Sequence, residues 1–211
     1  MRRITDIVVA LIVLSLLTPL LLVVGLAIVI SSPGNPFYRG WRVGKNGRRF
    51  RLWKFRTMVR NAVQIGPAIT VRNDSRITPL GRLLRKTKLD ELPQFLNVMA
   101  GEMTLVGPRP EAPEIVDLYD GQQRNVLLVK PGVTGLVQLK WADESEEIPQ
   151  GDGDNRYYIE NLLDKKLQVD LEYLRTRTSL TDAQIVWRTA ALILRRLVSI
   201  PLKYRRSTSA A

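Results

Sequence analysis

The sequence predicts an α+β, mainly helical protein that carries a membrane segment at its N-terminus. Three observations support this fold class. Residues 7–30 form an uncharged apolar run of 24 residues, two short alternating segments flank Asn46-Gly47, and apolar residues recur at helical spacing over much of the remaining chain. With 211 residues, the chain is long enough for one domain with a core besides the membrane segment.

The apolar run over residues 7–30 is long enough to cross a bilayer, because 24 helical residues at ~1.5 Å each exceed the thickness of the hydrocarbon core. We therefore expect this segment to lie in lipid. A cleaved signal peptide is the alternative. However, the run is longer than an ordinary signal-peptide core, and the following SSPGNPFYRG has no small-x-small cleavage pattern.

Pro19 lies near the middle of this run and predicts a bend, because proline removes one helical hydrogen bond and clashes with the preceding turn. Ser15 and Thr18 carry hydroxyl groups that can satisfy the freed backbone groups. The pair Thr18-Pro19 is therefore interpreted either as a bend in a spanning helix or as the apex of a re-entrant hairpin that returns to the same leaflet.

Basic residues on both sides of the run favour the hairpin. Arg2 and Arg3 precede the run, and residues 39–60 contain nine Lys and Arg. Because such residues near the ends of a membrane segment prefer the cytoplasmic side, both ends are expected there. We interpret residues 1–33 as a re-entrant membrane anchor that is bent at Thr18-Pro19.

A small β-hairpin is expected after the anchor, over residues 37–58. Its turn is placed at Lys45-Asn46-Gly47, because Asn-Gly readily adopts the positive φ of a type I′ turn. Residues 79–100 then predict an interrupted amphipathic helix. Its apolar positions are Leu80, Leu83, Leu84, Leu92, Leu96 and Met99, and its basic positions are Arg82, Arg85, Lys86 and Lys88.

Pro93 is the interruption in this helix. It is accommodated best if a new helix starts just before it, with Asp90 as the N-cap and Pro93 in the first turn. Beyond it, residues 107–114 are too rich in proline to be regular, and residues 130–144 indicate a loop that leads into a short strand. Apolar spacing predicts a helix over residues 155–173.

Residues 182–204 combine apolar and basic positions in a pattern that suits a helix lying in an anionic membrane interface. A helix that faces the protein core is the alternative. We therefore divide the chain into the anchor of residues 1–33, a central domain of residues 34–180, and a basic amphipathic helix and tail of residues 181–211.

Composition restricts the chemistry. Lys and Arg number 32 against 20 Asp and Glu, a net charge of +12, which implies an anionic partner such as lipid headgroups, nucleotide phosphates or nucleic acid. The absence of cysteine excludes disulfides and thiolate metal sites and fits a reducing compartment. The absence of histidine removes the commonest general base and transition-metal ligand, so carboxylates, Lys, Tyr and Ser/Thr remain.

Asp90 and Glu91 are the strongest candidates for chemistry. Two adjacent carboxylates near Arg85, Lys86 and Lys88 can stay ionised, bind a divalent cation and meet a phosphate in a basic environment. This combination suits phosphoryl transfer. The alternative is purely structural, with Asp90 as an N-cap and Glu91 as an ordinary first-turn residue.

Three further motifs are unspecific when taken singly. Arg109 lies between two prolines in GPRP, where a stiff backbone can present its guanidinium to a phosphate. Lys54 and Arg56 alternate with apolar residues in KFRTM, as in a half-buried strand. The segment PGVTG at residues 131–135 alone indicates a turn.

Taken in order, these motifs closely resemble the bacterial sugar transferase family, the monotopic phosphoglycosyl transferases. The resemblance covers nearly the whole chain, and its core is LDELPQFLNV followed closely by VGPRP. It implies a re-entrant hairpin bent at Thr18-Pro19 and a catalytic domain with interfacial helices, seated on the cytosolic face of the bacterial cytoplasmic membrane. It also implies that Asp90 and Glu91 are the catalytic dyad of the family.

The resemblance further implies a two-step reaction. Asp90 attacks the sugar-bearing phosphate of a UDP-sugar and expels UMP, and undecaprenyl phosphate then takes the sugar phosphate from the aspartyl intermediate. The product is undecaprenyl diphosphate sugar, which initiates surface glycan biosynthesis. Glu91 is expected to hold Mg²⁺, Arg85 and Arg109 are expected to bind phosphate, and Lys54 and Arg56 are weaker phosphate-binding candidates.

The resemblance also sets the expected partners. These are membrane lipids and the two substrates, without nucleic acid, while a homodimer and contact with downstream glycosyltransferases stay open. The chain departs from the family at Gly40, where many relatives have Gln, and we expect the minimal catalytic form without the extra membrane helices of larger relatives. The rival interpretations are a membrane-tethered basic binding module and a scaffold without activity, which metal-dependent release of UMP would exclude.

Overall fold

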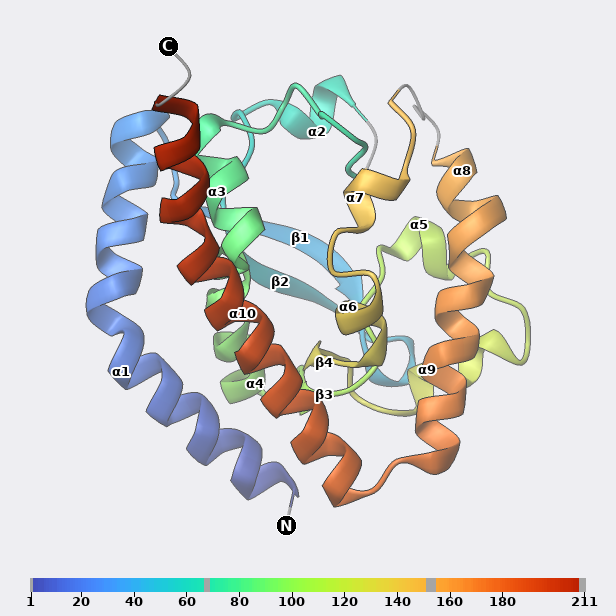
Figure 1. Ribbon diagram of the computed structural model, residues 1–211. Helices are drawn as coiled ribbons and strands as arrows, with labels where there is room; N and C mark the ends of the chain where they lie inside the picture. The colour runs from blue at the N-terminus through green and yellow to red at the C-terminus, as the bar shows by residue number, and fades with distance from the viewer. Residues whose placement is uncertain (1, 67–68, 151–154, 209–211) are drawn as a thin grey trace.

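The computed structural model describes residues 2–66, 69–150 and 155–208 (Figure 1). Helices dominate the described chain. The long helix α1 (Arg2–Ser31) lies along one side, the long helix α10 (Ser179–Thr208) crosses the front, and α9 (Asp164–Thr176) lies on the side opposite α1 (Figure 1). Small sheets lie between them, so the expectation of a mainly helical α+β protein is confirmed.

The apolar N-terminal run forms one continuous helix. Among the described residues, it is the one helix that is long and apolar enough to cross a membrane, over Arg3–Ser31 with a mean hydropathy of 3.1. Pro19 lies inside α1, and the helix bends near its middle (Figure 1). Thr18 Oγ1 donates to the carbonyl oxygen of Leu14 at 2.7 Å. The bend is therefore a change of direction within one helix, and not a loop between two helices.

The N-terminal end of α1 is bound to the domain by polar contacts. The Arg3 guanidinium donates to the carbonyl oxygen of Val98 at 2.5 Å and to that of the next residue at 3.1 Å. The buried Asp6 carboxylate accepts from the Thr104 hydroxyl at 2.7 Å and from the following backbone N–H at 3.2 Å. These bonds hold the start of α1 against the segment that leads to Arg109.

The C-terminal end of α1 is bound to the same domain. Val24 and Ile28 are buried in one cluster with Phe55 and Leu84. The Arg56 guanidinium donates to the carbonyl oxygens of the two residues that follow α1. Both ends of the bent helix therefore contact one domain, while apolar side chains between them stay exposed, namely Leu11, Ile12, Leu16, Leu22, Val23 and Leu26.

The β-hairpin is confirmed. Strands β1 (Phe37–Val43) and β2 (Arg49–Phe55) pair antiparallel, with Phe37 opposite Phe55. In the connecting turn η1 (Lys45–Gly47), Asn46 has φ 57° and Gly47 has φ 74°. The Asn-Gly pair thus supplies the positive φ angles for which the sequence indicated it.

The segment over residues 79–100 is interrupted as expected, but its geometry differs. It consists of α3 (Pro79–Thr87), the 3₁₀ helix η2 (Leu89–Gln94) and α4 (Phe95–Ala100). The break is at Lys88, whose left-handed φ of 60° turns the chain and caps η2. The expectation that Asp90 is the N-cap is therefore wrong, because Asp90 lies one residue inside η2 and its carboxylate is free for another role.

Within residues 130–144, the apolar residues after Gly135 predicted a short strand, but the strand lies before them in the sequence. Strand β4 (Gly132–Thr134) pairs parallel with β3 (Thr104–Val106), and the apolar run itself forms α6 (Leu136–Lys140). The strands approach closely, because a Cβ on Gly132 would lie 2.1 Å from the Gly107 nitrogen. Glycine is therefore required there, and its weak strand preference hid the strand in the sequence.

The remaining elements enclose the largest core cluster. They are α2 (Ala62–Ile65), α5 (Pro113–Val116), η3 (Gln123–Leu128), α7 (Glu144–Glu147), α8 (Arg156–Tyr158) and the π-helical turn η4 (Ile159–Leu163). Ile115, Val116, Leu162 and Leu167 pack in this cluster between α5 and the α8–α9 helix. The helices expected over residues 155–173 and 182–204 are both confirmed.

Candidate active site

Asp90 is held in a buried position at the start of η2. Thr78 caps α3 by accepting from the Gly81 N–H, and the left-handed Lys88 then turns the chain inward. Asp90 is 6% exposed. Within the described part of the chain, its Oδ1 is a buried atom without a hydrogen-bond partner. A buried carboxylate oxygen without a partner is costly, so it is a candidate for contact with a ligand.

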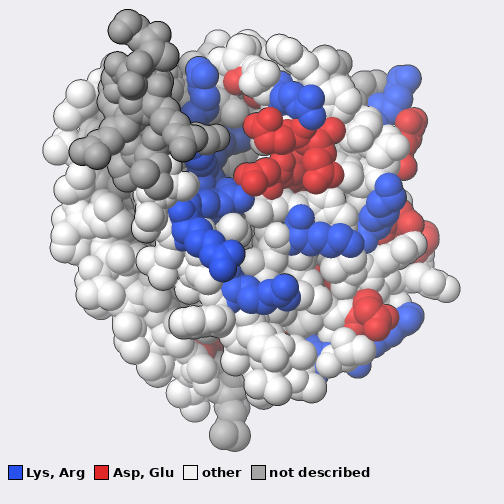
Figure 2. Space-filling view, in the orientation of Figure 1, with Lys and Arg blue, Asp and Glu red and all other residues white. Residues whose placement is uncertain are grey.

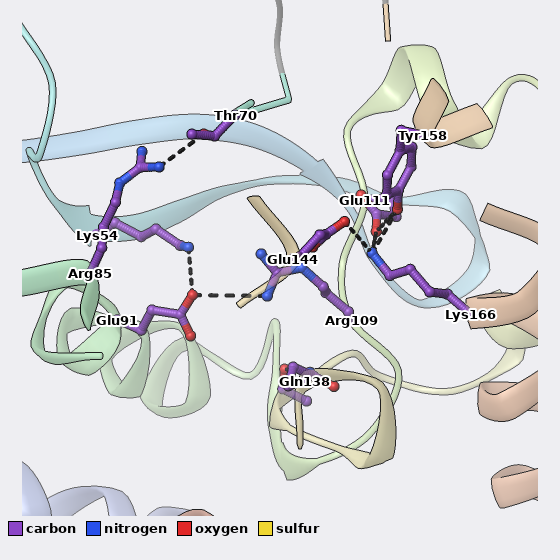
Figure 3. A network of polar contacts seen from close by, with 11 residues as sticks. Lys54, Thr70, Arg85, Glu91, Arg109, Glu111, Gln138, Glu144, Tyr158 and Lys166 are labelled. Carbon is purple, nitrogen blue, oxygen red and sulfur yellow. Dashed lines mark hydrogen bonds and ion pairs between the residues drawn. The ribbon is translucent and has the colours of Figure 1, made fainter. Parts of the chain in front are cut away.

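Cations from two other segments meet at Glu91. Lys54 Nζ, from β2, lies 2.8 Å from Glu91 Oε1, and Arg109 Nη1, from the loop after β3, lies 3.9 Å from the same atom (Figure 3). Burial alone would raise the pKa of Glu91, but Lys54, Lys88 and Arg109 hold it well below its usual range. Glu91 is therefore ionised at neutral pH.

The pKa of the neighbouring Asp90 is shifted in the opposite direction. Burial raises the pKa of Asp90, and the charge of Glu91 adds to the rise, while Lys54 and Arg85 oppose it. Two adjacent carboxylates thus have environments that separate their pKa values, which is typical of sites where two carboxylates have different roles. Asp90 is therefore the more basic of the two carboxylates.

Arg85 lies near the dyad without contacting it directly. Its Nε donates to Thr57 Oγ1 at 2.8 Å, and its Nη1 donates to Thr70 Oγ1 at 2.9 Å (Figure 3). Burial lowers the pKa of Arg85, and the charge of Asp90 is the largest influence that raises it again. The two threonines hold this cation within electrostatic reach of Asp90.

Arg56 is placed differently from the other basic candidates. Its guanidinium binds the carbonyl oxygens of Ser32 and Pro33 at the end of α1. Arg56 thus binds the end of α1, and it lines the cavity over the dyad without an ion pair to Asp90 or Glu91. The structure brings together Asp90, Glu91, Lys54 and Arg109, with Arg85 nearby, and leaves Arg56 outside this group.

A large cavity of about 2070 Å³ opens over the dyad. Its polar part contains the dyad, Lys54, Arg85 and Arg109. Its apolar part is lined by α1 and α10 through Val9, Val13, Leu16, Leu20, Val186, Ile193 and Leu197. One continuous cavity thus joins a charged site to an apolar groove.

The dyad fits Mg²⁺ in the manner usual for phosphate chemistry. Mg²⁺ is commonly held by one or two carboxylates together with substrate phosphates, and not by a cage of protein ligands. Over residues 2–66, 69–150 and 155–208, there is no group of three or more His, Cys, Asp or Glu that could hold a metal ion. The Glu91 carboxylate and the unpartnered Oδ1 of Asp90 therefore fit a cation that a bound phosphate helps to hold.

Gly40 is enclosed by Tyr38. A Cβ on Gly40 would lie 2.6 Å from the Tyr38 hydroxyl oxygen, and both residues line the cavity. The aromatic side chain therefore occupies the space that a longer side chain at position 40 would need.

Sequence reasoning missed a buried polar network beside Arg109. Lys166 Nζ donates to Glu144 Oε1 at 2.7 Å and to the Tyr158 hydroxyl at 2.8 Å, and it lies 3.5 Å from Glu111 Oε1 (Figure 3). Tyr158 in turn donates to Glu111 at 2.7 Å. No sequence signal marked this group, because Glu111 and Glu144 come from other segments and only the fold brings them to Tyr158 and Lys166.

Glu144 belongs to an acidic patch on the surface. The first turn of α7 contains Glu144, Glu146 and Glu147, and Figure 2 shows this acidic patch bordered by Lys and Arg side chains. Asp143 beside it bonds to Arg196 of α10 at 2.8 Å. The patch lies at the edge of the cavity, which Glu144 and Asp143 both line.

The chain is similar to known proteins over most of its length. The family model described as bacterial sugar transferase matches residues 1–196. The UDP-glucose:undecaprenyl-phosphate glucose-1-phosphate transferase of Escherichia coli is 36% identical over 90% of this chain and 39% of that protein. A protein of the same name from Caulobacter vibrioides is 35% identical over 92% of this chain and 69% of that protein.

A third relative is closer in length. The exopolysaccharide production protein ExoY of Sinorhizobium fredii is 34% identical over 89% of this chain and 83% of that protein. By contrast, the chain spans about two fifths of the Escherichia coli relative, 39% of its length. Since the family model covers nearly all of the sequence, including the dyad, GPRP and the N-terminal helix, the chain belongs to the bacterial sugar transferase family.

Proposed function

We propose that this protein is a phosphoglycosyl transferase that moves a sugar-1-phosphate from a UDP-sugar to undecaprenyl phosphate. One observation carries the proposal: the buried pair Asp90 and Glu91, with separated pKa values, lies among Lys54, Arg85 and Arg109 at the end of an apolar groove. The names of the relatives supply the substrate class, a UDP-sugar and undecaprenyl phosphate.

In the first step, a carboxylate oxygen of Asp90 attacks the sugar-bearing phosphorus of the donor. A bond forms between this oxygen and phosphorus, the bond to the bridging oxygen of the diphosphate breaks, and UMP leaves with the electron pair. Lys54 and Arg109, which meet at Glu91, offset the charge that develops on the departing phosphate. The result is an aspartyl phosphosugar.

In the second step, a phosphate oxygen of undecaprenyl phosphate attacks the same phosphorus. The bond to Asp90 breaks, its carboxylate is restored, and undecaprenyl diphosphate sugar leaves. Because Asp90 is buried, water has little access to the intermediate, which favours transfer over hydrolysis. This product would initiate a surface glycan, in agreement with the exopolysaccharide role named for one relative.

Glu91, together with the free Oδ1 of Asp90, is the group that would hold Mg²⁺. When bound, Mg²⁺ supplies positive charge that neutralises the diphosphate. Lys54 already contacts Glu91 at 2.8 Å, so this residue keeps the carboxylate ionised and oriented for the cation.

The acceptor fits the apolar part of the cavity. Undecaprenyl phosphate joins a long apolar chain to one phosphate, and the cavity joins a groove between α1 and α10 to the cationic site. The acceptor chain would lie along Val13, Leu16, Ile193 and Leu197, with its phosphate near Arg85 or Arg109. The exposed apolar residues of both helices would extend this groove into lipid.

The location that we propose is monotopic, on the cytosolic face of the bacterial cytoplasmic membrane. Both ends of α1 contact one domain, through Arg3 and Asp6 at its start and Arg56 at its end, which supports an arrangement with both ends on the side of Asp90. Exposed Leu180, Trp187, Leu194 and Val198 give α10 an apolar surface suited to the interface.

The proposal is tested with a panel of UDP-sugars. Purified protein is incubated with each donor, Mg²⁺ and undecaprenyl phosphate in detergent micelles, and UMP and the lipid product are measured. We expect at least one donor to give both products in equal amounts. A failure of every donor to release UMP, with the protein folded, would contradict the assignment.

A further inference from the structure

The helix over residues 156–176 contains a π-helical turn, η4, between α8 and α9. Such turns contain one residue more than an α-helical turn and are frequent at functional sites. Besides Tyr173, which bonds to Asp182 of α10, this helix carries three deeply buried polar side chains. Tyr158, Lys166 and Asp170 are 1%, 3% and 4% exposed.

The π turn places Tyr158 and Lys166 on the same face of the helix. In an uninterrupted α-helix, a residue eight positions on is turned by about 80° from the first, whereas a residue seven positions on lies within about 20°. Yet Lys166 Nζ lies 2.8 Å from the Tyr158 hydroxyl and 4.5 Å from the centre of its ring. The extra residue of η4 therefore places Lys166 where residue 165 would otherwise lie, and Asp170 follows one turn later on the same face.

This face lies against the Arg109 loop. Asp170 lines the same small cavity as Arg109 and Glu111, and Arg109 opposes the rise that burial causes in the pKa of Asp170. Two residues further along the loop, the Glu111 carboxylate is bound by Tyr158 at 2.7 Å and faces Lys166 at 3.5 Å. Because Pro108 and Pro110 restrict the backbone on both sides of Arg109, holding Glu111 also restricts the direction in which the Arg109 side chain leaves the loop.

Lys166 also controls the charges around the Arg109 guanidinium. This guanidinium lies between Glu91 on one side and Glu111 and Glu144 on the other (Figure 3), and all three carboxylates act on it. Its distance to Glu91 is 3.9 Å, which is a loose ion pair. Lys166, at 2.7 Å from Glu144 and 3.5 Å from Glu111, neutralises the competing pair. Without it, two partly buried carboxylates would attract Arg109 away from Glu91.

We propose that Lys166 is a positioning residue that keeps the Arg109 guanidinium on the phosphate side of the cavity by engaging Glu111 and Glu144. The proposal rests on the proposed function, in which Arg109 binds the donor phosphate. Lys166 itself is 3% exposed and does not reach that phosphate in this account. Lys166 acts through Arg109, and η4 is the structural element that brings Lys166 to Glu111 and Glu144.

The test uses Lys166→Met, which keeps the length of the side chain and removes its charge. The full-length protein is assayed with Mg²⁺, undecaprenyl phosphate and the UDP-sugar that gives the highest turnover in the panel. We expect kcat/KM to fall about a hundredfold, as for a catalytic group displaced by ~1 Å. Lys166→Arg should recover much of this loss. Lys165→Met, at the exposed neighbouring lysine, is the matched control and should leave activity unchanged.

Two further measurements separate positioning from general destabilisation. In an Arg109→Ala background, Lys166→Met should change kcat/KM by less than about threefold, because the group through which it acts is already absent. Adding Glu144→Gln to Lys166→Met should restore activity about tenfold, because one competing carboxylate is then neutral. A purely structural lysine would show neither effect.

Equal losses in the wild-type and Arg109→Ala backgrounds, or no recovery with Glu144→Gln, would overturn the inference. These outcomes leave the proposed function intact as long as the wild-type protein releases UMP. If the wild-type protein released no UMP with any donor, the proposed function itself would fail first. Thermal unfolding of each variant is measured in parallel to show that it folds. The kcat/KM values of the double variants are compared between variants that unfold cooperatively.

Discussion

Lys54 Nζ lies 2.8 Å from Glu91 Oε1, although strand β2 and the 3₁₀ helix η2 are far apart in the sequence. This ion pair joins the β-hairpin to the dyad. It holds Glu91 in its ionised form while its neighbour Asp90 becomes more basic. The hairpin therefore contributes Lys54 to the candidate active site.

Replacing Lys54 with Met should lower kcat/KM by about two orders of magnitude, since loss of one preorganised cation commonly costs 10²–10³ in rate. The charge that opposes Glu91 and the departing phosphate would be missing. The measurement is the initial rate of UMP release. Arg48→Met, at an exposed cation of the hairpin turn, is the control and should behave as wild type. A loss below threefold for Lys54→Met would contradict this role.

Turnover should require Mg²⁺, and the Mg²⁺ concentration that it requires should depend on Glu91. We expect removal of Mg²⁺ with excess chelator to stop turnover and the same ion to restore it, because the diphosphate charge is then neutralised again. Glu91→Gln should raise the Mg²⁺ concentration needed for half-maximal rate by at least about tenfold, because one anionic ligand is lost. Turnover that persists in chelator would show that the dyad works without a divalent cation.

Asp170 predicts a specific pH dependence of stability. Burial raises the pKa of Asp170 to about 7, well above the usual range of an aspartate, with Arg109 and Lys166 opposing the rise. A raised folded-state pKa means that the folded protein holds this proton more strongly between about pH 4 and pH 7. The contribution of Asp170 to stability is therefore complete below about pH 4 and is lost as the pH rises through about 7.

Asp170→Asn should remove this dependence, because an amide does not titrate in this range. We measure the thermal unfolding temperature of Asp170→Asn and of wild type at pH 5.5 and at pH 8.5. Relative to wild type, the variant should unfold at a higher temperature at pH 8.5 than it does at pH 5.5. The corresponding free energy is on the order of a few kcal/mol. An unchanged difference at both pH values would show that the carboxyl of Asp170 titrates normally.

Topology is tested by cysteine labelling, because the chain contains no cysteine of its own. In spheroplasts, neither Arg2→Cys nor Lys45→Cys should react with an impermeant maleimide, and both should react after lysis. The reason is that Arg3 and Asp6 bind the start of α1 to the domain that holds Asp90. Labelling of position 2 alone in spheroplasts would show a spanning helix.

Pro19→Ala provides a second arm of the same experiment. A straight α1 would pull its N-terminal end away from Val98 and Thr104, to which Arg3 and Asp6 are bound. We therefore expect this variant to increase the labelling of position 2 in spheroplasts.

Local patterns in the sequence predicted much of the fold. The Asn46-Gly47 turn, the bend at Pro19 and the C-terminal helix each depend on residues close in the chain, and each was found where expected. The N-cap role of Asp90 was wrong because the sequence does not show that Lys88 adopts a left-handed conformation. Strand β4 was misplaced because it contains a glycine that only the contact with Gly107 explains.

The candidate site was predictable where a motif marked it. Asp90, Glu91, Lys54 and Arg109 are brought together as expected from GPRP, KFRTM and the dyad. Lys166, by contrast, depends on a π turn that shifts the helical register, and a period of 3.6 residues cannot reveal it. Arg56 carried a motif signal, and its contacts with the end of α1 could not be predicted because they join segments that are far apart in the sequence.

The central claim, that Asp90 forms a covalent bond to the sugar phosphate, is tested most directly by intact-protein mass spectrometry. The protein is incubated with the preferred UDP-sugar and Mg²⁺ in the absence of undecaprenyl phosphate. Wild-type protein should gain the mass of one sugar phosphate at Asp90 and release no more than one UMP per chain, and Asp90→Asn should show neither. An adduct at another residue, or a tenth of wild-type turnover retained by Asp90→Asn, would contradict the account.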